Sequence, residues 1–126
     1  MFPTTKLVFD YLNSQGYLPQ IQDNGNLLFR SRDLTYIYVD NDNDAEFLQL
    51  ILPGIFDVTE DNRDVVLEAM NKVAFSMKVA KPVIINDQVW LFFENLIDST
   101  PDVSTIIPRA IGILAGARDE FYKEIE

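Results

Sequence analysis

The residues with the clearest capacity for chemistry lie between Asp40 and Glu46, where carboxylates alternate with asparagine amides. Oxygen-rich side chains are the ligands that calcium prefers, and the spacing is similar to the start of an EF-hand loop. The sixth position, however, is Ala45, where that loop needs glycine, and the twelfth is Ile51, where it needs a bidentate glutamate. We therefore predict a solvated turn between two strands and no dedicated metal site, with weak calcium binding by residues 40–46 as an alternative.

The set of reactive side chains is otherwise small, because the 126 residues include no histidine and no cysteine. Ser-His-Asp and Cys-His catalysis, disulfides and the common zinc sites are therefore excluded. Acidic residues fall mostly in predicted turns and on helix surfaces, where solvation does not favour acid–base catalysis. Glycine-rich phosphate loops are also missing. We predict a protein that is not an enzyme, with no catalytic residue and no cofactor, and keep a carboxylate-based enzyme as an alternative.

The charge balance restricts the choice of partner. Twenty Asp and Glu residues oppose ten Lys and Arg residues, which gives a net charge of -10. An acidic surface without clustered cations repels nucleic acid and anionic membranes, so we predict neither as a partner. The sequence shows no signal peptide and no apolar run of membrane-spanning length, so we expect a cytoplasmic protein. With 48% hydrophobic residues, residues 1–126 are expected to form a single domain with its own core.

One aromatic side chain lies away from the predicted core. A helix is expected from about residue 62 to residue 79, and its core-facing stripe is Val65, Val66, Ala69, Met70, Val73 and Met77. Phe75 falls on the opposite face, together with Glu68, Asn71 and Lys72. These four residues are the candidate site for a protein partner of unknown identity, because an aromatic ring offered to solvent is typical of a binding surface. Packing of Phe75 against a neighbouring loop is the alternative.

The remaining elements follow from hydrophobic periodicity and turn residues. A short helix is expected to end near Gly16, and the last helix is expected to start at the Thr100 cap and to be kinked or delayed by Pro108. The predicted strands are residues 27–31, 35–39, 46–52, 83–85 and 89–96. The order α-β-β-β-α-β-β-α predicts an α+β fold with an antiparallel five-stranded sheet flanked by helices.

Several strands are apolar at successive positions. The clearest examples are residues 27–29, 36–39, 47–52 and 90–93. An antiparallel sheet with one solvated face should alternate apolar and polar residues instead. The second face must therefore be covered, either by a helix of the same chain or by a second copy, and we expect a homodimer.

The order of elements resembles the type III secretion chaperone-like fold, and within it the YbjN-like family of bacterial sensory-transduction regulators. The local similarity lies in residues 67–73, Lys81 to Ile84, Gln88 to Glu94 and a long final helix ending in Phe121. The resemblance implies a small acidic protein without enzymatic activity, often dimeric, that binds protein partners or modulates their stability. Pro108 departs from a regular helix, and this departure weakens the transfer of any interface on that helix.

Overall fold

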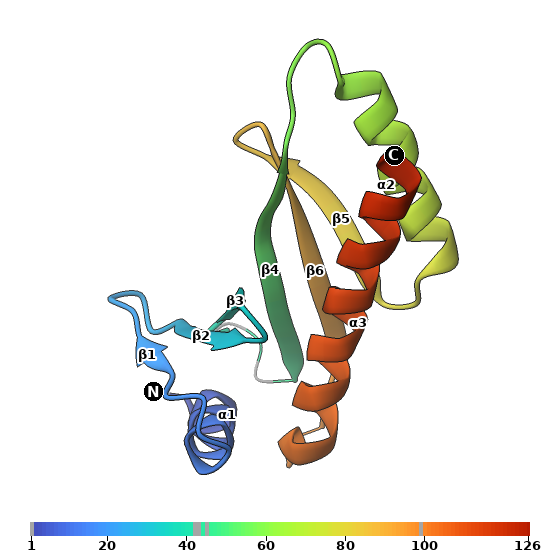
Figure 1. Ribbon diagram of the computed structural model, residues 1–126. Helices are drawn as coiled ribbons and strands as arrows, with labels where there is room; N and C mark the ends of the chain where they lie inside the picture. The colour runs from blue at the N-terminus through green and yellow to red at the C-terminus, as the bar shows by residue number, and fades with distance from the viewer. Residues whose placement is uncertain (1, 42–43, 45, 99) are drawn as a thin grey trace.

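The structure is a computed structural model that describes residues 2–41, 44, 46–98 and 100–126 (Figure 1). Its elements, in chain order, are α1 (Pro3–Ser14), β1 (Gln20–Ile21), β2 (Leu27–Ser31), β3 (Leu34–Tyr38), β4 (Phe47–Asp57), α2 (Arg63–Ser76), β5 (Ala80–Ile85), β6 (Gln88–Leu96) and α3 (Val103–Ile125). The α+β class is confirmed, but the predicted element order and the count of five strands are wrong, since the described residues form six. The extra strand is β1, whose two exposed residues are too few to show a periodicity.

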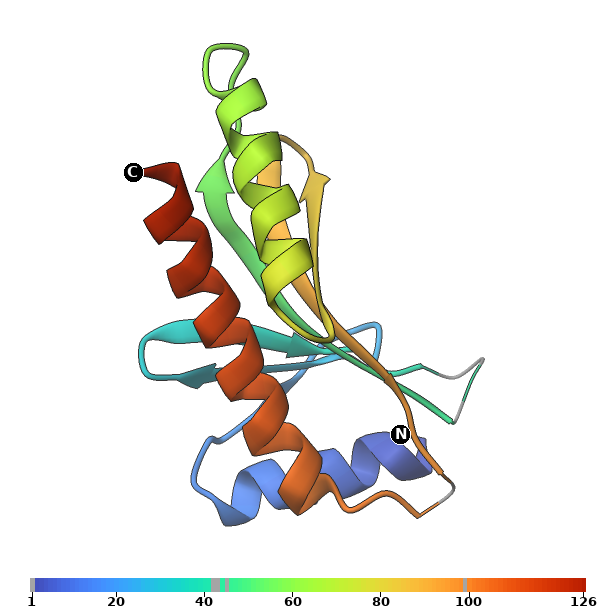
Figure 2. The same ribbon diagram turned by 90° about the vertical axis from the view of Figure 1, so that its right-hand side faces the viewer.

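The strands form one antiparallel sheet in the spatial order β1-β2-β3-β4-β6-β5. Asn86 and Asp87 form the predicted turn between β5 and β6, and both have positive φ angles, of 50° and 60°, as a two-residue hairpin of type I′ requires. Register pairs join β3 to β4 at two positions within the described residues. Figure 2 shows the β2–β3 ribbon lying across the direction of β4 and β6. The sheet is therefore strongly twisted at its β3–β4 junction.

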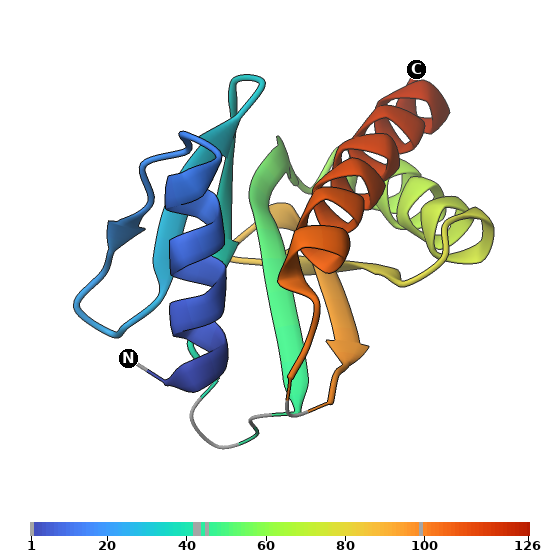
Figure 3. The same ribbon diagram turned by 90° about the horizontal axis from the view of Figure 1, so that it is seen from below.

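The helices of the described chain cover one face of the sheet, which we call the inner face (Figures 1 and 2). α2 and α3 contact each other and pack over β4, β5 and β6, while α1 contacts α3 near β2 and β3 (Figure 3). Alternate strand residues point into this layer and are buried: Leu27, Phe29, Tyr36, Tyr38, Leu48, Leu50, Leu52, Val89, Leu91 and Phe93. The expectation that helices flank the sheet therefore holds for one face, and none of the described helices covers the other.

β4 is longer than the sequence predicts. The predicted strand ends at residue 52, just before Pro53 and Gly54, a dipeptide that is common in turns. Instead, β4 continues to Asp57, with an irregular register against β6 between Leu52 and Phe56. Gly54 has a φ of 58°. A bulge accommodates a proline without an N–H and a glycine with positive φ, so the pair bends the strand without ending it.

α2 is shorter than predicted and its core stripe is narrower. Val66, Ala69, Met70 and Val73 are buried as expected, but Val65 is exposed, because burial centres on the arc between Val66 and Val73. The helix ends at Ser76 and not at residue 79.

α3 begins at Val103, three residues after the predicted Thr100 cap. The hydroxyls of Ser104 and Thr105 donate hydrogen bonds to the Asp102 carboxylate, at 2.5 and 2.9 Å. Pro108 lies in the second turn, and α3 continues through it. The helix tolerates Pro108 because only one intrahelical bond is lost near its start.

Candidate protein-binding surface

Phe75 is 92% exposed on the outward side of α2. Glu68, Asn71 and Lys72 are also exposed and share this side of the helix, as the sequence predicts. The alternative in which Phe75 packs against a loop is wrong, because so large an exposed fraction leaves no room for a covering contact. We call these four residues the α2 ridge.

A groove of about 680 Å³ lies beside the α2 ridge, between α2 and α3. Its lining combines ridge residues with small or acidic neighbours: Asn71, Lys72, Ala74, Phe75, Ser76, Glu120 and Glu124. The Lys72 ammonium lies 3.8 Å from the Glu68 carboxylate and 3.4 Å from that of Glu124. Counting Glu68, Glu120 and Glu124 against Lys72, the ridge and groove carry three negative charges and one positive charge, a net of −2.

The chain that leaves α2 holds an unusual conformation. Val79 has a φ of 60° and is 48% exposed. Left-handed backbone at a β-branched residue is strained, and such strain concentrates at binding sites. Helical periodicity had extended the helix through Val79, so sequence reasoning missed this feature. No local pattern marks a valine for a positive φ.

A second apolar surface lies on the face opposite the helices. Six residues form it, and we call them the outer strip: Leu28, Ile37, Ile51, Val83, Trp90 and Phe92. Register pairs connect Leu28 to Ile37, Ile37 to Ile51 and Ile51 to Phe92, so these four form a row across β2, β3, β4 and β6. Val83 pairs with Trp90, and the Trp90 and Phe92 rings stack with centroids 6.5 Å apart. The expected second apolar face is thus present.

An ion pair borders the outer strip. The Lys81 ammonium lies 2.6 Å from the Glu94 carboxylate and 5.6 Å from the centroid of the Phe92 ring. The Gln49 amide donates a 2.7 Å hydrogen bond to the same carboxylate. These contacts neutralise the charges that lie closest to the aromatic side chains.

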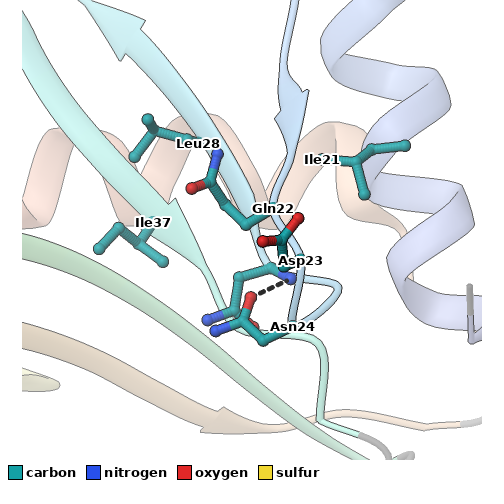
Figure 4. Close-up of a pocket in the computed structure, with 7 residues that line it drawn as sticks. Ile21, Gln22, Asp23, Asn24, Leu28 and Ile37 are labelled. Atoms are coloured by element: carbon teal, nitrogen blue, oxygen red, sulfur yellow. Dashed lines mark hydrogen bonds between the residues drawn. The ribbon is translucent and has the colours of Figure 1, made fainter.

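At its β2–β3 end, the outer strip adjoins a hollow of about 450 Å³. Figure 4 shows Leu28 and Ile37 on one side and Ile21 on the other, with Gln22, Asp23 and Asn24 between them. The Asn24 side chain accepts a 3.0 Å hydrogen bond from the Asn26 backbone N–H. Asp23 is the one titratable group lining this hollow, so the hollow lacks the second carboxylate that acid–base catalysis by a carboxylate pair, the alternative kept from the sequence, needs.

The alternative calcium turn falls partly on residues 42, 43 and 45, which lie outside the described residues. Asp40 accepts a hydrogen bond from the Thr5 hydroxyl, and the Asp44 carboxylate accepts one from the Glu46 backbone N–H at 3.2 Å. In the part of the chain that the structure describes, no three His, Cys, Asp or Glu side chains gather as metal ligands. Calcium binding by residues 40–46 stays a prediction.

The resolved pKa shifts belong to groups outside the α2 ridge. Hydrogen bonds from the Ser104 and Thr105 hydroxyls lower the pKa of Asp102, whereas a general acid needs a raised one. Burial raises the pKa of Tyr38 to about 12 and also raises that of Tyr36. Both tyrosines lie on the inner face, under the helices. Their shifts therefore reflect packing.

No protein-family model matches the chain, and no curated protein matches it. The resemblance to YbjN-like proteins therefore stays a prediction. Of the described helices, none is long and apolar enough to span a bilayer.

Proposed function

We propose that this chain is a non-enzymatic protein-binding module whose α2 ridge and groove hold a short apolar segment of a basic partner. The observation that carries the proposal is Phe75, an aromatic ring 92% exposed on the outward face of the last turn of α2. Aromatic side chains dominate the energetics of protein interfaces, and a groove at the side of the ring lets a partner side chain pack against it.

The charge of the site favours a cationic partner. Lys72 contacts Glu68 and Glu124, so the ridge offers carboxylates in excess of its cation. The chain as a whole carries -10, which attracts a basic segment at long range and repels an acidic one. A helix or extended segment with apolar anchors and flanking Lys or Arg residues meets both requirements.

Selection from a random peptide library tests this chemistry without a known partner. Wild-type chain serves as bait, and Phe75→Asp serves in a counter-selection. We expect the enriched peptides to share apolar anchors and basic flanks, and to bind Phe75→Asp at least about 30-fold more weakly, as for the loss of an interface hot spot. Leu18→Asp is the matched control, because Leu18 is 77% exposed away from α2.

Backbone amide shifts of the isotope-labelled chain locate the bound peptide. The expected shifts lie in residues 68–76 and 120–124, and increasing salt should weaken binding because the attraction is between opposite charges. Enriched peptides that are acidic, or that bind Phe75→Asp as tightly as wild type, would refute the proposed site.

A further inference from the structure

The outer strip lies on the face that the described helices leave bare. The row from Leu28 to Phe92 crosses four strands, and Ile51 at its middle is only 7% exposed because its cross-strand neighbours enclose it. Trp90 and Val83 widen the row toward β5. The result is a continuous apolar surface, and continuity distinguishes a binding face from scattered exposed side chains.

The strand positions of this face carry no net charge, although the chain carries -10. Its charged strand positions are Arg30, Asp57, Lys81 and Glu94, two cations and two carboxylates. The strand positions of two copies can therefore approach each other without a net repulsion between like charges. A basic partner gains nothing from it, in contrast to the α2 ridge.

The chain exposes more surface than a monomeric protein of its mass, and the excess is similar in size to one side of an ordinary protein interface. A monomeric protein of 14.5 kDa is expected to expose about 6,900 Å². This chain exposes 7475 Å², an excess of roughly 600 Å². Each partner in a standard protein interface buries about 800 Å². One interface between two copies would remove an area of this order.

The edges of the sheet are poorly suited to joining two copies through strand hydrogen bonds. The free edge on one side is β1, which has two residues, and on the other side it is β5. Pro82 lies within β5 and has no N–H to donate to an added strand. Face-to-face packing, which needs no strand hydrogen bonds, is the remaining way to join two sheets.

We propose that two copies of the chain pack their outer strips against each other as a two-fold symmetric homodimer. The two sheets then enclose the aromatic side chains of both copies, and the helices face outward. The proposal uses a surface distinct from the α2 ridge, so it goes beyond the protein-binding function. The two proposals can therefore be tested independently.

Light scattering and Trp90 fluorescence test the dimer on the unmodified chain. Trp90 is the only tryptophan in the sequence, so fluorescence reports on this face alone. We expect a dimer mass at high concentration and, on dilution through dissociation, a red shift of emission with greater quenching by acrylamide. Raising NaCl from about 0.05 M to about 0.5 M should strengthen the dimer by screening the charge of its copies, the opposite of its effect at the α2 ridge. A monomer mass at about 500 µM, where any specific dimer of micromolar affinity is formed, overturns the proposal.

Two aspartate substitutions assign the surface. Phe92→Asp should weaken the dimer at least about 100-fold, because it places a carboxylate in the apolar contact of each copy. Phe75→Asp, the same change on the α2 ridge, should leave the dimer intact while weakening peptide binding at least about 30-fold. Circular dichroism verifies that each variant folds. If Phe92→Asp does not fold, Ile37→Lys is the second variant of the outer strip. A dimer that Phe75→Asp dissociates, or that survives both outer substitutions, also overturns the proposal.

Discussion

The two faces of the sheet are built from the same strands but with different side chains. On β4, the inner positions are Leu48, Leu50 and Leu52, all essentially inaccessible to solvent. The intervening outer positions Gln49 and Ile51 mix an amide with an aliphatic chain. On β6, the outer positions add aromatic rings and a paired carboxylate. Both faces carry aromatic rings, but the inner face of these two strands is apolar at every buried position, whereas the outer face combines its apolar side chains with polar groups that tolerate water, as suits a removable partner.

The largest contrast is expected from neighbouring phenylalanines on β6. Phe93 is 4% exposed on the inner face, whereas Phe92 is half-buried on the outer face. Phe93→Ala should lower the free energy of unfolding by about 3–5 kcal/mol, because it leaves a cavity under the helices. Phe92→Ala should lower it by about 1 kcal/mol in the monomer, because less apolar area returns to water. Denaturant unfolding at low protein concentration measures both, and equal losses would remove the distinction between the faces.

A smaller contrast is expected in strongly alkaline solution. Burial under the inner face raises the pKa of Tyr38 from 10.0 to about 12, so the folded state holds the phenolic proton more tightly than the unfolded state. This stabilisation is complete below pH 10 and is lost as the pH rises from about 10 to about 12, by about 2 kcal/mol. Unfolding measured across this range should show a smaller loss for Tyr38→Phe. Identical profiles for the two proteins would place the alkaline sensitivity elsewhere.

The smallest effect is expected from the ion pair on the outer face. Lys81 is more than half exposed, so its pair with Glu94 is screened by water despite the 2.6 Å distance. Lys81→Met should change the free energy of unfolding by no more than about 1 kcal/mol, and Lys81→Arg by less. A loss of several kcal/mol would show that the outer face is enclosed in solution. If this loss disappears when the protein is diluted, the enclosing molecule is a second copy of the chain.

Sequence patterns predicted the apolar faces of α2 and of the sheet better than they predicted which elements pack against those faces. Helical periodicity placed Phe75 opposite the core, and continuous apolar runs in the strands indicated a second buried face. Which face the helices choose depends on tertiary packing, which periodicity does not contain. Local signals also misled at Pro53 and Gly54, whose turn chemistry forms a bulge here, and at Val79, whose backbone is forced by the connection from α2 to β5.

The narrow β3–β4 junction has a consequence for how the molecule opens. Two register pairs, Ile37 with Ile51 and Tyr38 with Leu50, join the N-terminal ribbon to the long strands in the described chain. Next to them, the Val39 backbone N–H donates a 3.1 Å hydrogen bond to the Gln49 carbonyl oxygen. Side-chain packing and the Tyr36 hydroxyl, which donates to the Ile111 carbonyl oxygen at 3.5 Å, add to this attachment. Such a joint lets α1 and β1–β3 separate as one cooperative unit while the paired β4 and β6 stay folded. Amide protons of β2 and β3 should accordingly exchange with deuterium together, and sooner than those in the centre of β6.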